Sequence, residues 1–288
     1  MKCKSMITAA KNSSESAVAT GSEFTVTPTP DPKETEETEG TEETAIGITI
    51  AKGNGYITTP RYEGQFITRS KGLYFKTSSG NYIKKRFFTY KNNVYNAGKD
   101  GVITRGWLCR KGHYYFFSRK NGRLIMGKKS DGIKISKYGI AKENEYTVCK
   151  IKTFIDAKKV VNKVSSFSDS KADKLYKSFK WLEACGYIRY RTYKEAKASY
   201  PEDWEIIFAN DIFGTHNGCC VSESCALAFL AKECGYKNVT ICCDTAHAWT
   251  DIEGRLYDPL FAESRSFSAN YNAAYTDYRA NPAITKKV

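Results

Sequence analysis

Long apolar runs are absent from this chain of 288 residues. A membrane-spanning helix needs roughly eighteen or more consecutive apolar residues, and no stretch approaches that length. The first ten residues are basic but lack the continuous apolar core of a secretory signal peptide. The sequence therefore predicts no membrane span. It fits either a cytosolic protein or a chain whose export segment is missing or removed.

Motifs for bound cofactors are also missing. There is no P-loop and no Gly-rich dinucleotide motif, so no nucleotide or other organic cofactor is expected. No two of the ten cysteines have the C-x₂-C spacing that lets a pair of thiolates hold one zinc ion. A metal site built from Cys219, Cys220, Cys242, Cys243 and His247 is the alternative that this spacing disfavours. No metal is expected.

Acidic residues are scarce between residues 50 and 142. This stretch holds 21 lysine and arginine residues against only Glu63, Asp100 and Asp131, a net charge of +18 in a chain whose total is +14. So basic a segment should attract polyanions, with an affinity that falls as salt rises. An anionic cell-wall polymer or glycan is the expected partner. Lysine and arginine interleaved with aromatics also suit single-stranded nucleic acid, but nothing else in the sequence supports that alternative.

Apolar residues are scarce near the N-terminus. Residues 11–45 contain a Ser/Thr-rich stretch, then alternating threonine and proline, then an acidic run. Such a composition cannot bury a core. The sequence predicts a disordered spacer over residues 1–49.

A repeat of glycines and aromatic residues follows over residues 50–142. Tyr74, Tyr95 and Phe116 are 21 residues apart. Gly80, Gly101 and Gly122 have the same spacing. Each unit reads as two short alternating strands around a glycine-bearing turn, which is one β-hairpin. Because a lone hairpin is barely stable, the units are expected to stack into an all-β domain.

This repeat resembles the cell-wall-binding repeats of bacterial surface proteins, which engage choline or glucans in some relatives. The resemblance implies an extracellular or cell-wall-associated protein. It also points to four aromatic residues as candidates for stacking on a ligand: Tyr95, Trp107, Tyr114 and Tyr115. The alternative is that these aromatics pack one hairpin on the next.

Residues 217–235 predict a helix with both ends marked. Asn217 is a good N-cap, and Gly235 suits the left-handed position after the last turn. Cys220 then lies in the first turn, where free N–H groups and the helix dipole favour a thiolate. Asn217 or a backbone N–H near Cys220 could stabilise an oxyanion.

Histidine is rare, with three in the chain, and one of them, His247, lies in a β-prone run. A four-residue loop over residues 251–254 would place His247 opposite Asp258 on the next strand. A two-residue loop, Glu253-Gly254, would make the pair diagonal but still within reach. Asp258 could instead only cap a turn before Pro259.

Further helices are expected over residues 157–164, over 171–182 with Asp169 or Ser170 as the cap, and from residue 201 to 209. Residues 146–151 read as a strand. These elements place the start of a second domain near residue 143.

Together, Gly218-x-Cys220, His247-Ala248-Trp249 and Tyr257-Asp258-Pro259 resemble the core motifs of the transglutaminase-like cysteine enzymes. The resemblance implies a papain-like α+β fold for residues 143–288. It also implies a catalytic triad in which Cys220 is the nucleophile, His247 the general base and acid, and Asp258 the carboxylate that orients it.

The expected activity is acyl transfer on an amide of a protein or peptide. The Cys220 thiolate would form a thioester, which water resolves in a peptidase or amidase and an amine resolves in a cross-linking enzyme. The expected protein is thus a cell-surface cysteine enzyme held at the wall by its basic repeats. The alternative is a non-enzymatic adhesin that keeps an inactive scaffold of this type.

Overall fold

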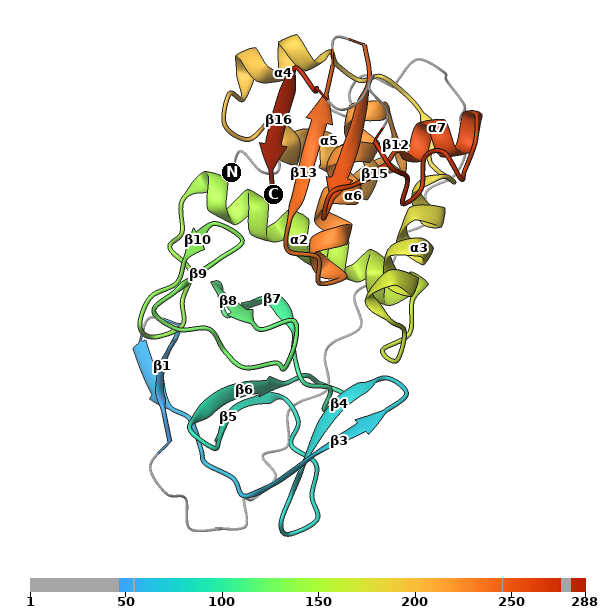
Figure 1. Ribbon diagram of the computed structural model, residues 1–288. Coiled ribbons are helices and arrows are strands. Elements are labelled where there is room, and N and C mark those ends of the chain that lie inside the picture. The colour runs from blue at the N-terminus through green and yellow to red at the C-terminus, as the bar shows by residue number, and fades with distance from the viewer. Residues whose placement is uncertain (1–46, 54, 245, 276–280) are drawn as a thin grey trace, which may run out of the picture.

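The computed structural model describes residues 47–53, 55–244, 246–275 and 281–288. The spacer predicted over residues 1–49 therefore lies almost wholly outside the described residues. The described chain is a mixed α/β structure with small antiparallel hairpins in its N-terminal half and helices around a four-stranded sheet in its C-terminal half (Figure 1). We refer to residues 47–142 as the repeat region and to residues 143–288 as the C-terminal region.

The repeat region consists of consecutive two-stranded antiparallel sheets. The strand pairs are β1 (Thr49–Lys52) with β2 (Gly55–Thr58), β3 (Gly64–Arg69) with β4 (Gly72–Thr77), β5 (Arg86–Tyr90) with β6 (Asn93–Ala97), β7 (Gly106–Arg110) with β8 (His113–Phe117), and β9 (Lys129–Ser130) with β10 (Ile133–Lys134). The prediction of one hairpin per repeat is confirmed.

Two of the hairpins have tight turns of two residues. Lys91 and Asn92 join β5 to β6 with φ values of 44° and 56°, and Lys111 and Gly112 join β7 to β8 with φ values of 50° and 80°. Two consecutive positive φ angles fit the turn whose twist matches that of paired strands.

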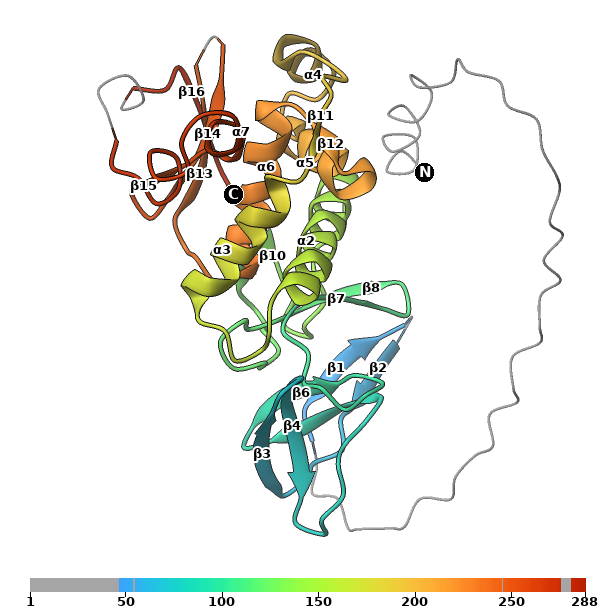
Figure 2. The ribbon, with the colours of Figure 1, turned by 90° about the vertical axis from the view of Figure 1, so that its right-hand side faces the viewer.

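The C-terminal region begins with α2 (Glu145–Val164), which Asn144 caps in a reciprocal pair with Thr147. The predicted strand over residues 146–151 is wrong, because the buried residues of this segment recur at helical spacing. They include Ile151, Phe154, Ala157 and Val161. Figure 2 shows α2 lying between the β7–β8 hairpin and the other helices.

The next helices are α3 (Lys171–Leu182), α4 (Tyr193–Ser199) and α5 (Trp204–Thr215). Helix α3 has the predicted bounds, and its cap is Ser170, bonded reciprocally with Asp173. The short strands β11 (Gly186–Tyr187) and β12 (Asn217–Gly218) pair in parallel. No helix in the described part of the chain has the length and apolar character needed to cross a membrane.

A four-stranded antiparallel sheet supports helix α6 (Cys220–Glu233). Its strands run in the order β15 (Arg255–Tyr257), β14 (Ala248–Ile252), β13 (Val239–Cys243) and β16 (Ile284–Lys287). Helix α6 packs across β13 and β14. The Thr250 hydroxyl ties the two layers by donating to the Ser224 carbonyl at 2.9 Å. Helix α7 (Pro259–Ser264) follows β15 directly.

One apolar core joins the two regions. Trp107 and Phe116 of the last long hairpin belong to the same cluster as Ile151 and Phe154 of α2. The C-terminal region is therefore built directly onto the end of the repeat region.

Candidate catalytic site

The N-cap of helix α6 lies two residues after the predicted one, Asn217. The N-cap is Cys219. Cys220 is the first helical residue, which agrees with its predicted place in the first turn. Asn217 lies in β12, where its side-chain amide donates to the Thr215 carbonyl at 2.7 Å, so the N-cap prediction for Asn217 is wrong. At the other end, Gly235 has φ of 100° directly after the C-cap, as predicted.

Cys220 lies against the strand that follows His247. Its side chain is buried, with 4% exposed, and its sulfur accepts a hydrogen bond from the backbone N–H of Ala248. Ala248 is the residue after His247, so the backbone that follows the histidine lies against the first turn of α6.

Cys219 has different hydrogen-bond partners from Cys220. Its sulfur lies 3.7 Å from the Ser222 hydroxyl, which donates to Asp211 at 3.1 Å. Asp211 in turn pairs with Arg191 at 2.5 Å. Cys219 is thus connected to α5 and to the chain before α4.

The two neighbouring thiols hold one proton between them, which leaves one negative charge on the pair. A hydrogen bond from Cys220 lowers the pKa of Cys219 to about 5, with further help from the N–H groups of Ser222 and Val221. The same bond raises the pKa of Cys220, and burial raises it further. Cys219, which occupies the cap position, is thus favoured over Cys220 as the thiolate of the pair.

His247 is held on three sides. Its Nε2 lies 2.6 Å from Oδ2 of Asp258, and both side chains are buried. The ring stacks on Phe261, with centroids 3.8 Å apart and planes 9° apart. Its backbone N–H donates to Asp244 at 2.6 Å. This side chain has one orientation fixed by contacts.

The hairpin that presents this pair has the shorter of the two loops considered. Thr250 pairs with Tyr257 and Ile252 with Arg255, which leaves a loop of two residues, Glu253-Gly254, with φ of 53° and 82°. The four-residue loop is wrong, and His247 meets Asp258 diagonally. Asp258 also caps α7 by accepting from the Phe261 N–H at 3.1 Å, so it serves as cap and histidine partner at once.

This geometry determines which ring nitrogen can move a proton. A carboxylate at Nε2 favours the tautomer with a proton there and leaves Nδ1 as the basic nitrogen. An Asp–His pair of this kind stabilises an imidazolium when Nδ1 takes up a proton from a nearby thiol.

Glu223 is a buried acid that sequence reasoning missed. It lies one turn after Cys219 on α6, is 2% exposed, and its Oε2 has no hydrogen-bond partner among the described residues. Burial, and then the charges of Glu263 and Asp258, raise its pKa to about 9. A signal was present, since Glu223 is the one charged residue between Cys219 and Leu230 in an otherwise small and apolar helix.

The four aromatic residues proposed to stack on a ligand are all core residues. Tyr95, Trp107, Tyr114 and Tyr115 are each between 0% and 7% exposed. Tyr95 of β6 lies against Phe66 of β3, and Tyr115 of β8 lies against Phe87 of β5, so both rings pack one hairpin on another. The ligand-stacking prediction is therefore wrong for these residues, because none presents a ring face to solvent.

Within the described residues, no three histidine, cysteine, aspartate or glutamate side chains are grouped so that they could hold a metal ion. The metal alternative built on the two vicinal cysteine pairs and His247 thus has no support in this geometry.

Comparison with known proteins yields structural neighbours only. No protein-family model and no curated protein matches the chain. The chain is similar to the modular Cpl-1 endolysin complexed with a peptidoglycan analogue, at 18% identity, 30% of this chain, 26% of that chain and a TM-score of 0.27. It is also similar to choline binding protein F from Streptococcus pneumoniae, at 19% identity, 31% and 28% coverage and a TM-score of 0.26.

A third neighbour is the choline binding domain of Spr1274 in Streptococcus pneumoniae, at 16% identity, 28% of this chain, 96% of that chain and a TM-score of 0.26. The aligned part spans only about a quarter of the endolysin and of choline binding protein F. These neighbours are choline-binding or cell-wall-binding repeat proteins, the class that the sequence of the repeat region resembles. At such scores the likeness carries no argument about activity.

Proposed function

We propose that the C-terminal region is a transglutaminase-like cysteine enzyme that transfers acyl groups from peptide amides. The observation that supports this most is the buried His247–Asp258 pair, bonded at 2.6 Å, together with the hydrogen bond from the next residue, Ala248, to Cys220 at the start of a buried helix. This is the arrangement by which a histidine activates a thiol for attack on a carbonyl.

In the proposed reaction the Cys220 sulfur attacks the amide carbonyl carbon while its proton passes to Nδ1 of His247. His247 then donates that proton to the leaving amine as the C–N bond breaks, and a thioester remains on Cys220. Asp258 stabilises the imidazolium formed between these two steps. Water resolves the thioester in hydrolysis, and a primary amine resolves it in transfer. The scheme requires no metal and no organic cofactor.

The oxyanion of this reaction would form at the start of α6. The first-turn N–H groups of a helix have no intrahelical acceptor and point toward such a charge. Asn217 stays a candidate donor, since its amide carries two hydrogens and the Thr215 carbonyl accepts one of them.

The wild-type enzyme would be tested with a glutamine-containing peptide and a primary amine, and the products identified by mass spectrometry. A peptide that loses ammonia and gains the mass of the amine indicates transfer. A peptide whose mass changes by the replacement of an amide with an acid indicates hydrolysis. Cys220→Ala and His247→Ala should abolish either product, while the buried Cys225→Ala control should retain it. No product over a panel of peptide amides, or full activity in Cys220→Ala, would refute the proposal.

A non-enzymatic adhesin is the second candidate, and one observation favours it. Cys220 and His247 are only 4% and 7% exposed, so a substrate must displace part of the surrounding surface to reach the sulfur. In this function the C-terminal region is a scaffold, and the basic repeat region holds the chain on an anionic wall polymer by charge. That attraction, and a location at the cell surface, belong to both candidates.

A further inference from the structure

A large cleft lies between the repeat region and the C-terminal region. It is at the C-terminal end of α6, the end opposite Cys220. Its volume is about 1350 Å³. Residues of the repeat region line one side, and residues of α2, of the segment after α2 and of the C-terminal end of α6 line the other. Cys220 and Glu233 lie at opposite ends of this helix, about 20 Å apart at 1.5 Å per residue. The interface cleft is therefore a separate site from the cysteine and histidine.

Basic side chains dominate its lining. Nine basic residues face three acidic ones. The basic residues are Lys71, Arg105, Arg119, Lys120, Lys129, Lys158, Lys174, Lys232 and Lys237, and the acidic ones are Asp100, Asp131 and Glu233.

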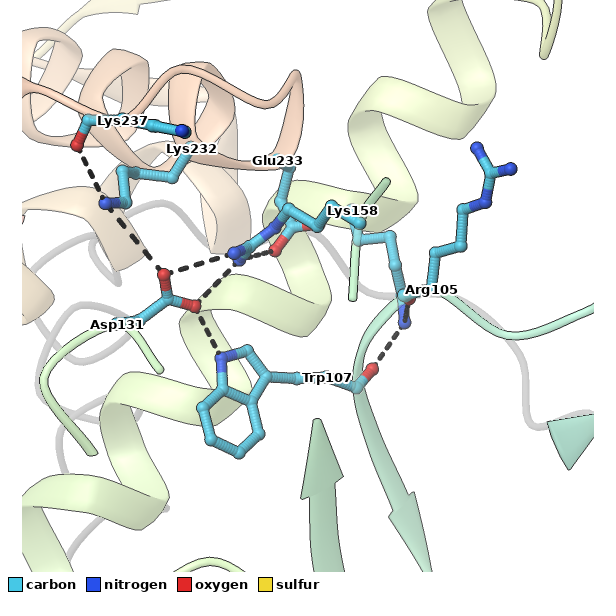
Figure 3. A network of polar contacts seen from close by, with 8 residues as sticks. Arg105, Trp107, Asp131, Lys158, Lys232, Glu233 and Lys237 are labelled. Carbon is cyan, nitrogen blue, oxygen red and sulfur yellow. Dashed lines mark hydrogen bonds and ion pairs between the residues drawn. The ribbon is translucent and has the colours of Figure 1, made fainter. Parts of the chain in front are cut away.

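Two of the three acids are already neutralised. Arg119 donates to Asp131 at 2.9 Å and to Glu233 at 2.5 Å, and Asp131 also accepts from the Trp107 indole at 2.8 Å (Figure 3). Lys232 lies 4.0 Å from the same aspartate. The acids thus leave most of the positive charge in the cleft without a carboxylate partner.

Arg105 shows this imbalance most clearly. Its guanidinium lies over the Phe167 ring at 4.6 Å, and its Nε is buried without a hydrogen-bond partner among the described residues. In Figure 3 the side chain extends away from Asp131 and Glu233. Burial alone lowers its pKa, and no neighbouring carboxylate offsets that effect.

Two lysines beside it are held by neutral groups. The Lys158 ammonium donates to the carbonyls of Arg105 and Trp107, and burial lowers its pKa. The Lys174 ammonium donates to the Phe167 carbonyl at 3.2 Å. Partly buried cations whose hydrogen bonds go only to carbonyl groups are costly, and an anion entering the cleft would lower that cost.

We propose that the interface cleft binds a linear, phosphate-bearing polyanion that carries no nucleobases. This inference rests on the attraction of the repeat region to polyanions proposed above, and it names the place of binding. The cleft is larger than the roughly 300–1,000 Å³ typical of small-ligand pockets, which suits several linked units. The planar fork of Arg105 suits two phosphate oxygens, and the lysines serve as point charges along the chain.

The test measures binding of inorganic polyphosphate to the full chain by calorimetry at several salt concentrations. Arg105→Ala with Lys129→Ala removes two cations of the cleft. Lys84→Ala with Lys137→Ala is the control, since it removes the same charge from exposed sites of the repeat region outside the cleft. We expect the cleft variant to bind about tenfold or more weakly with a shallower salt dependence, and the control to stay within about threefold of wild type.

The outcomes are distinct. Equal affinity of the two double variants would overturn the cleft as the site while leaving the general attraction to polyanions intact. No binding of polyphosphate by wild type would overturn that attraction itself. Tighter, cleft-dependent binding of single-stranded DNA of equal charge would replace the proposed occupant with nucleic acid. Thermal melting of each variant shows whether it is folded.

Discussion

At the scale of single residues, several acidic groups lie close together at the start of α6. Glu223, Asp258 and the Cys219–Cys220 pair all lie near it, and each of these side chains is buried. The site accommodates them because Cys219 and Cys220 share a proton, Asp258 bonds to His247, and Glu223 has its pKa raised to about 9. At neutral pH, Glu223 is therefore a neutral acid beside the proposed reaction centre.

This raised pKa makes stability depend on pH. Between the ordinary value near 4.5 and about 9, the folded state binds more protons than the unfolded state, so stability falls as pH rises through that window. Glu223→Gln removes the effect. The stability of the variant relative to wild type should improve by about 2–4 kcal/mol between pH 5 and pH 8. Urea unfolding at both pH values measures this, with exposed Glu202→Gln as the control. A pH-independent difference would show that Glu223 is ionised in the folded protein.

Much of the site could be predicted from residue spacing. The interval from His247 to Asp258 spans one tight hairpin, which brings the two together with either loop length considered. The roles of Cys219 and Glu223 could not be predicted this way. The pKa of Glu223 depends on burial and on Glu263 and Asp258, which come from other elements, and the pKa of Cys219 depends on the hydrogen bond from Cys220, on burial and on which of the two cysteines takes the cap position.

At the scale of elements, the repeat hairpins owe their stability to aromatic packing between units. The Phe75 ring of β4 lies against Phe88 of β5 with centroids 4.9 Å apart, and the Phe87 ring of β5 lies against Tyr115 of β8 with centroids 5.1 Å apart. Each two-stranded hairpin buries its rings against the next unit or, for the last long hairpin, against α2. The aromatic residues that mark the repeat in the sequence are thus the residues that hold it together.

Trp107 tests this interpretation. Trp107→Ala removes a fully buried indole and its bond to Asp131, and should destabilise the protein by about 3–5 kcal/mol. Tyr56→Ala, at a residue 64% exposed, should cost less than about 1 kcal/mol. Chemical denaturation measures both. A Trp107→Ala protein with wild-type stability but no affinity for wall polymers would restore the ligand-stacking role.

The hairpins and helix α3 could be predicted because their signals are local. The hairpins are marked by glycines at the turns and by alternating residues in the strands, and the helix is marked by its N-cap. The single helix α2 could not. Its β-branched and aromatic residues favour a strand over 146–151, and burial against the β7–β8 hairpin and α6 overrides that preference. The buried aromatics of the repeats were ambiguous for a related reason, since the same alternating pattern suits either packing or a binding surface.

At the scale of the whole molecule, the Arg119 cluster fastens the two regions together. Arg119 comes from the loop after β8, Asp131 from the β9–β10 turn and Glu233 from the end of α6. Burial lowers the pKa of Arg119, but Glu233 and Asp131 more than offset this, so its pKa is raised overall. The arginine stays charged and neutralises two carboxylates that have little access to water.

Arg119→Ala removes the arginine partner of Glu233 and leaves Asp131 with only the Trp107 indole and Lys232. We expect a loss of about 3–5 kcal/mol in unfolding free energy, against a change within about 0.5 kcal/mol for Arg123→Ala on the exposed side of the same loop. Urea titration followed by fluorescence and circular dichroism would measure both. Equal stability of the two variants would mean that the cluster does not join the regions.

The most direct measurement of the proposed catalysis is site-resolved alkylation of Cys220. In a Cys219→Ala background, limiting iodoacetamide at neutral pH should modify Cys220 faster than the fully buried Cys225, because a base at Nδ1 of His247 can take the thiol proton. Adding His247→Ala should slow that reaction about tenfold or more. If Cys220 reacts no faster than Cys225, or at the same rate without His247, the sulfur and the imidazole do not work together and the enzyme proposal is wrong.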